Sequence, residues 1–138
     1  MRAGVCLFAA IALCPGVGSA QAIPGHEQDG PAEICGITAQ GALEFEAKVR
    51  ADDAYREQDR NALYVLFSAD DGLRQWAFAT RDNPAYPAAT CRRITRDDGG
   101  NLHSSRRIAC EGPKIECDRV YLQFKSVDER LNQALRKD

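Results

Sequence analysis

The clearest structural signal in the chain is residues 62–80, which read ALYVLFSADDGLRQWAFAT. Residues 62–68 and 73–80 are rich in aromatic and aliphatic side chains, and Asp70, Asp71 and Gly72 between them are typical of a turn. Trp76 and Phe78 are two positions apart and therefore lie on one face of a strand. This pattern predicts a β-hairpin whose second strand contributes Trp76 and Phe78 to the core.

Three further elements follow this hairpin. Residues 90–96 and 102–110 flank a turn at residues 97–101 and predict a second hairpin. Residues 119–125 alternate apolar and polar side chains, which predicts a fifth strand. Ser126 and Glu129 have the spacing of a capping box, so a last helix is expected to begin there.

The segment before the first hairpin is ambiguous. Residues 43–50 alternate apolar and polar side chains as a half-buried strand does, and a short helix could then begin near Asp52. Residues 42–60 also contain no Gly or Pro and are rich in helix-forming residues. We favour a helix over 42–60, in which Leu43, Ala47, Ala51, Ala54 and Tyr55 share one face. The fold class expected is α+β: an antiparallel meander of about five strands, with a C-terminal helix and an N-terminal helix packed on it.

The beginning of the chain has the features of an export signal. Arg2 is followed by an apolar run and then by small residues up to Ala22, which is the order of a secretory signal peptide. The apolar run is too short to span a bilayer. We therefore expect a signal peptide over 1–22, a flexible leader over 23–36, and a single disulfide-stabilised domain over 37–138, located in the periplasm or outside the cell.

Four cysteines remain after a signal peptide is removed, namely Cys35, Cys91, Cys110 and Cys117. An even number of cysteines in an exported chain predicts two disulfides. We favour Cys110–Cys117, because Gly112 and Pro113 between them are typical of a hairpin turn, together with Cys35–Cys91. The other two pairings remain open. Zinc is not expected, because no two cysteines have the short spacing of a structural zinc site.

Composition excludes some functions. The chain has 138 residues and a formal net charge of −2, which is unfavourable for a protein that binds nucleic acid by neutralising phosphates. No apolar segment after the signal is long enough to cross a membrane. We expect no cofactor and no metal.

The chain is poor in catalytic residues. Nucleophilic catalysis needs a nucleophile, a base and a group that orients the base. His103 is the one histidine in the predicted sheet, and Ser105 could lie on its face of the strand. We interpret His103 as an exposed hairpin residue, and catalytic residues are not assigned.

Two groups of residues are candidates for binding a partner. The loop at 83–87 contains Asn83, Pro84, Tyr86 and Pro87, and its two prolines would hold Tyr86 in a preorganised position. The second group comprises two arginine pairs on neighbouring strands: Arg92, Arg93, Arg106 and Arg107. If the turn at 97–101 is centred near Gly99, the two pairs lie nearly opposite each other, and like charges in such positions are unfavourable unless an acid or a ligand offsets them.

These observations together favour a small exported protein that is not an enzyme. We expect it to bind another macromolecule, as an inhibitor or immunity-type protein does, through a protein partner of unknown identity. A carrier of a small ligand is the alternative, and a small hydrolase that uses His103 is a weaker one.

Overall fold

The structure is a computed structural model that describes residues 30–136. Its centre is an antiparallel sheet of five strands: β3 (Tyr55–Arg60), β4 (Tyr64–Ala69), β5 (Arg74–Ala79), β6 (Ala88–Arg96) and β7 (Leu102–Cys110). The strands follow each other as a meander in the order β3-β4-β5-β6-β7. A separate hairpin is formed by β1 (Ala32–Ile34) and β2 (Ile37–Ala39), and helices are α1 (Ala42–Ala51) and α2 (Lys114–Leu135). The predicted α+β class is confirmed.

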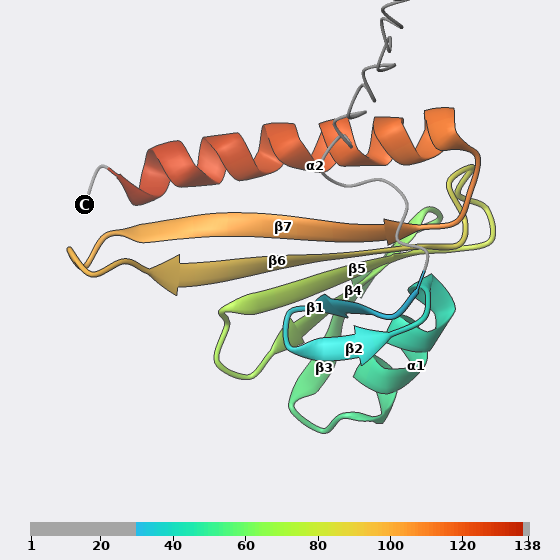
Figure 1. Cartoon of the computed structure of the whole chain (residues 1–138), viewed down its shortest axis with the longest axis horizontal. Helices are drawn as coiled ribbons and strands as arrows, with labels where there is room; N and C mark the ends of the chain where they lie inside the picture. The colour runs from blue at the N-terminus through green and yellow to red at the C-terminus, as the bar shows by residue number, and fades with distance from the viewer. Residues whose placement is uncertain (1–29, 137–138) are drawn as a thin grey trace, which may run out of the picture.

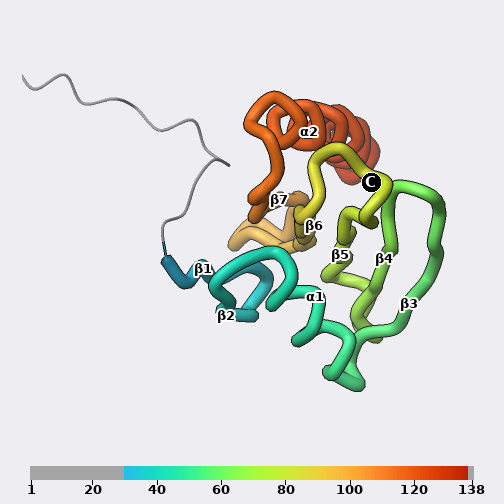
Figure 2. Tube along the Cα trace, turned by 90° about the vertical axis from the view of Figure 1, so that its right-hand side faces the viewer, coloured from blue at the N-terminus to red at the C-terminus, as the bar shows by residue number. Residues whose placement is uncertain are grey.

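The helices lie on opposite sides of the sheet. Helix α2 runs along β7 on one face, while α1 and the β1–β2 hairpin cover the other (Figure 1). The view in Figure 2 shows the same arrangement from the side, with α2 above the β6–β7 half of the sheet and β3 and β4 beyond it. We call the side of the sheet that α2 covers the α2 face, and the side that α1 and the β1–β2 hairpin cover the α1 face.

The main core lies on the α1 face, and it contains the predicted Trp76 and Phe78. Trp76 is fully buried, stacks on Phe78 with ring centroids 5.5 Å apart, and contacts Phe45 of α1 at 5.3 Å. The α2 face has a smaller apolar cluster, in which Val120 of α2 packs on alanines of β5 and β6 and on the preceding loop. Most large apolar side chains are therefore committed to one side of the sheet.

Both predicted hairpins are present. The β4–β5 turn contains Asp70 and Asp71, whose carboxylate accepts the Leu73 N–H at 2.8 Å. The β6–β7 turn is held by Asp97, whose Oδ1 accepts the Asn101 N–H at 2.8 Å. Aspartate is used at both turns because its short carboxylate can accept a nearby backbone N–H.

The predicted strand over 119–125 is wrong. These residues lie within α2, which begins after Pro113 and continues past the expected capping box at Ser126 and Glu129 without interruption. Val120 and Phe124 lie one helical turn apart and face the sheet, whereas Leu122 between them is 61% exposed. Alternation over so few residues is compatible with either structure, and tertiary packing selected the helix.

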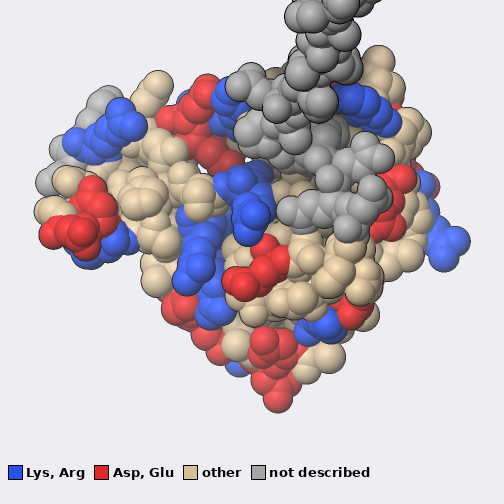
Figure 3. All heavy atoms as spheres, viewed as in Figure 1, with Lys and Arg blue, Asp and Glu red and all other residues tan. Residues whose placement is uncertain are grey.

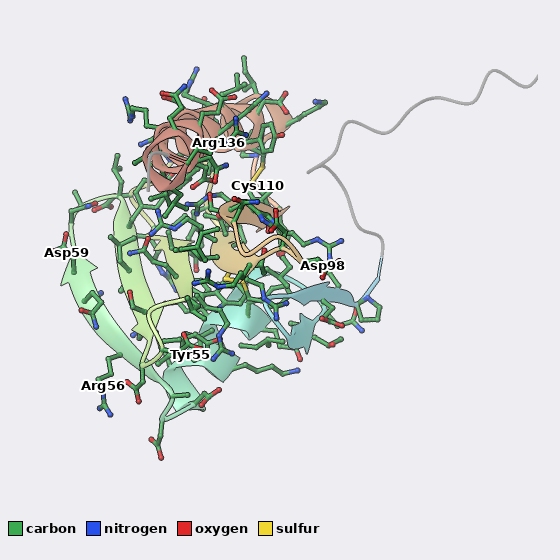
Figure 4. All side chains as sticks on the ribbon, turned by 90° about the vertical axis from the view of Figure 1, so that its left-hand side faces the viewer. Tyr55, Arg56, Asp59, Asp98, Cys110 and Arg136 are labelled. Atoms are coloured by element: carbon green, nitrogen blue, oxygen red, sulfur yellow. A yellow bond between two sulfur atoms is a disulfide. The ribbon has the colours of Figure 1, made fainter. Side chains whose placement is uncertain are left out.

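The region 42–60 also differs from the prediction. A helix is present, but it ends at Ala51, and the remaining residues form β3, an edge strand. The buried side chains of α1 are Ala42, Phe45 and Val49, while Leu43 is 50% exposed, so the shared face expected from the sequence is not the buried face. Arg56 and Asp59 of β3 extend away from the sheet (Figure 4), and such charged residues protect an open sheet edge from pairing with another chain.

The expected signal peptide over 1–22 and the first half of the leader, residues 23–29, lie outside the described residues. Strand β1 and Cys35 fall within 23–36, the range in which we expected a flexible leader. Ile34 of β1 is 1% exposed and belongs to the main core. The ordered domain therefore includes this part of the leader range.

Candidate functional site

The four candidate arginines do not form one surface. Arg92 pairs directly with Arg106 across β6 and β7, as predicted from the position of the turn. Side chains alternate between the faces of a strand, so Arg93 and Arg107 point to the other side. The α2 face therefore receives Arg92 and Arg106, and the α1 face receives Arg93 and Arg107.

Arg106 is a structural residue. Its side chain is 9% exposed, and its guanidinium donates to both carboxylate oxygens of Asp128 on α2, at 2.6 and 2.9 Å. It also donates to Thr90 Oγ1 at 2.9 Å and lies 4.4 Å from the centre of the Phe124 ring. These contacts join α2 to the sheet and leave Arg106 unavailable to a partner.

Arg92 lies next to this ion pair and is half-buried. Burial lowers the pKa of the Arg92 guanidinium, and the positive charge of Arg106 lowers it further, while the Asp128 carboxylate opposes both effects. Among the described residues, no hydrogen bond or ion pair is formed by its guanidinium. The register places Gln75 of β5 directly opposite Arg92 on its other side.

Three arginines of the α1 face form a second group, which we call the basic patch and define as Arg74, Arg93 and Arg107; Arg93 and Arg107 are exposed, and Arg74 is partly buried. Arg93 pairs with Arg74 of β5. Arg107 donates to the Glu33 carbonyl of β1 at 2.9 Å, and Arg74 forms an ion pair with Asp71 at 3.0 Å. Figure 3 shows basic side chains gathered across this side of the sheet. Arg93 itself has no hydrogen-bond or ion-pair partner among the described residues.

Arg74 was not predicted to belong to this group. Its face could have been found from alternation along β5, because Arg74 is two residues before Trp76. Its pairing with Arg93 could not, because a long loop and not a tight turn connects β5 to β6. The disulfide Cys35–Cys91 reinforces the same region, because Cys91 is two residues before Arg93 and pairs directly with Arg107. The basic patch therefore lies on a part of the sheet that is cross-linked to the β1–β2 hairpin.

The two disulfides have the favoured pairing, Cys35–Cys91 and Cys110–Cys117. The reason given for the second was wrong, because Cys117 lies in the first turns of α2 and not on a neighbouring strand. Cys110 at the end of β7 lies beneath α2 (Figure 4). This disulfide therefore fixes where α2 starts relative to the sheet.

The loop at 83–87 is held by internal contacts. Asn83 is 5% exposed; its side chain donates to the Leu63 carbonyl at 3.1 Å and accepts the Ala85 N–H at 2.9 Å. Tyr86, which precedes a cis bond to Pro87, is partly buried against the small cluster on the α2 face. Pro84 is exposed. Arg93 is six positions after Pro87 along β6, about 20 Å at 3.3 Å per residue, so the loop and the basic patch are distinct surfaces.

His103 is exposed near the tip of the β6–β7 hairpin, and its Nε2 lies 2.8 Å from Thr95 Oγ1. Hydrogen bonds from the backbone and side chain of Asn101 lower the pKa of the nearby Asp97, with smaller contributions from the Gly99 backbone and the charge of His103. Ser105 lies on the same face of β7, as expected from its spacing. Asp97 is engaged in holding the turn, so this group resembles a stabilised hairpin tip.

An open hollow of about 170 Å³ lies beside α2 and is lined by Arg106, Tyr121, Lys125, Asp128, Glu129 and Asn132. Carriers of small apolar ligands typically have enclosed cavities, whereas this hollow is open. Residues 30–136 contain no group of His, Cys, Asp and Glu side chains that could hold a metal ion.

Comparisons of the chain with protein-family models, with curated proteins and with solved structures gave no match. Within the described residues, no helix is long and apolar enough to cross a membrane.

Proposed function

We propose that the chain is an exported protein, not an enzyme, which uses the basic patch to bind a protein with an acidic surface. An inhibitor or immunity-type protein is the role we favour. The observation that carries this proposal is Arg93, an exposed guanidinium that has no acceptor among residues 30–136 and lies between Arg74 and Arg107. Each flanking arginine retains donors beyond those used by Asp71 and the Glu33 carbonyl.

The physical chemistry of the patch suits an acidic partner. Arginine presents several donors in a rigid fork that matches a carboxylate, and it is favoured at interfaces over lysine. Opposite charges across an interface accelerate association and exclude partners of the wrong charge. The Cys35–Cys91 disulfide fixes the strand beneath the patch, so little conformational entropy would be lost on binding.

An oxidising compartment is part of the proposal. Two disulfides are compatible with such a location, and the expected signal peptide would direct the chain there. Periplasmic and extracellular locations are equally consistent with these features. Mass spectrometry of the native protein would test this part of the proposal, because an intact N-terminus and four free thiols would contradict export.

A capture experiment tests the binding function. The oxidised protein serves as bait for envelope and secreted proteins of the cells that produce it. It is compared with a patch variant, Arg93→Glu with Arg107→Glu, and with a control variant, Arg130→Glu with Arg136→Glu. All four arginines are exposed, and both variants change the net charge by the same amount.

We expect the wild type and the control variant to capture the same acidic protein, and the patch variant to lose it. Capture should also weaken as salt is added, because screening reduces attraction between exposed charges. Equal capture by the two variants, or no specific capture by the wild type, would refute the proposed function.

A further inference from the structure

The α2 face carries an excess of positive charge that the described residues do not neutralise. Arg92 and Arg106 lie directly opposite each other, and both carboxylate oxygens of Asp128 are occupied by Arg106. Side chains that are opposite on neighbouring strands have their Cβ atoms about 5 Å apart, where like charges repel. A half-buried guanidinium without an acceptor adds a desolvation cost.

The surroundings of Arg92 contain a second donor. Gln75 is directly opposite Arg92 on β5, is partly buried, and its side chain has no hydrogen-bond partner among the described residues. The Arg92 fork and the Gln75 amide can therefore both donate to one anion on the α2 face.

Apolar side chains lie beside these donors. Ile94 is two residues after Arg92 on the same face of β6 and is partly exposed. Gln123 of α2 contacts the Tyr64 hydroxyl at 3.4 Å, which shows that this side of α2 is directed towards β4. Val127, one helical turn after Gln123, lies on the same side and is 38% exposed.

We propose that Arg92 and Gln75 form a binding site for the carboxylate of a small organic acid with a short apolar chain. The protein already contains the corresponding interaction, because Arg106 binds the Asp128 carboxylate through two parallel donors on the same face. Arg92 would donate to the ligand carboxylate in the same way as Arg106 donates to the Asp128 carboxylate. Ile94 and Val127 contact its apolar chain.

This site is separate from the basic patch, because Arg92 and Arg93 point to opposite faces of β6. Its occupancy does not depend on the protein partner proposed above. Arg93→Gln is therefore a matched control for Arg92→Gln: the two variants change adjacent residues in the same way.

The experiment observes the Arg92 Nε–Hε signal of the oxidised protein by NMR. Butyrate is titrated at constant ionic strength, and butyramide, its neutral analogue, and inorganic phosphate are titrated separately. We expect a saturable shift with butyrate and at least tenfold weaker binding of butyramide, in line with the loss of a charged hydrogen bond. Arg93→Gln should bind butyrate as the wild type does, and Arg92→Gln should bind at least tenfold more weakly.

Three results would overturn the proposal. A response of the wild type that does not saturate, or is equal for butyrate and butyramide, would show that there is no anion site. Unchanged butyrate binding in Arg92→Gln would place the site elsewhere. Tighter binding of phosphate than of butyrate would show that the ligand class is wrong. The wild-type titration decides the first and third questions even if a variant fails to fold.

Discussion

Replacing Asp128 with Ala should strongly destabilise the protein, because it would leave two arginines facing each other without a counter-ion. The Asp128 and Arg106 side chains are 10% and 9% exposed, and their two hydrogen bonds measure 2.6 and 2.9 Å. Removing one partner of a buried ion pair costs about 3–5 kcal/mol. Native domains are stable by only about 5–15 kcal/mol, so much of the stability of this domain would be lost.

Urea denaturation followed by Trp76 fluorescence measures this loss. With a slope of about 2 kcal/mol per molar urea, the unfolding midpoint should fall by about 2 M. Glu129→Ala is the control on the same helix, because Glu129 forms an exposed pair with Lys125 at 4.0 Å. An exposed pair contributes at most about 1 kcal/mol, so the control midpoint should change little.

A double variant separates the ion pair from simple loss of packing. Arg106→Met with Asp128→Leu replaces both charges with apolar groups, which is often close to neutral for a buried pair. This double variant should therefore be more stable than Asp128→Ala. A cost below about 1 kcal/mol for Asp128→Ala, or a double variant less stable than that single variant, would refute the reasoning.

Three further predictions concern the disulfides, the hairpin tip and the start of α2. Loop-closure entropy predicts that replacing Cys35 and Cys91 by Ser lowers the free energy of unfolding by about 4 kcal/mol, because this disulfide has a sequence separation of 56. The same change at Cys110 and Cys117, whose separation is 7, should cost about 2.5 kcal/mol. The urea midpoints of the two variants test this order. The pKa of Asp97 is lowered from its ordinary value of 3.8, so the stabilisation that its charge provides is complete well above pH 3.8 and disappears as the pH falls through the lowered value. In Asp97→Asn, the free energy of unfolding should therefore depend less on pH in this acidic range. Gly112→Ala should destabilise the protein by about 1–3 kcal/mol, because the added Cβ would overlap the Ala85 backbone. At Gly99 an added Cβ meets only side chains, at 3.2 Å or more, so Gly99→Ala should lower the melting temperature less than Gly112→Ala does.

Local sequence patterns predicted the structure correctly where neighbouring residues favour a single conformation. The Asp-Asp-Gly turn and the alternation of Trp76 and Phe78 predicted the β4–β5 hairpin, and the position of the 97–101 turn predicted that Arg92 and Arg106 would be opposite. Local patterns did not predict β3, in which Tyr55 is the one buried side chain. This charged segment becomes a strand because β4 offers it hydrogen-bond partners, and such pairing leaves no periodic pattern in the sequence.

The candidate site shows the same limit. Sequence alone identified four arginines as a group, but the period of two in a strand divides them between two faces. Asp128 was expected near the start of a helix, whereas it lies in the middle of α2 and binds Arg106. Its partner is 22 residues away and could be recognised only after α2 was placed on the sheet.

The turns, the β4–β7 hairpins, the presence of a C-terminal helix and the cysteines available for cross-linking could be predicted from the chain alone, because these depend on neighbouring residues. The helical structure of 119–125, the place of β3 in the sheet and the division of the arginines between paired and unpaired ones became clear only from the packed fold. These outcomes depend on burial and on charge pairing between distant segments. The free energy of such contacts exceeds the small local preferences that a sequence pattern reports.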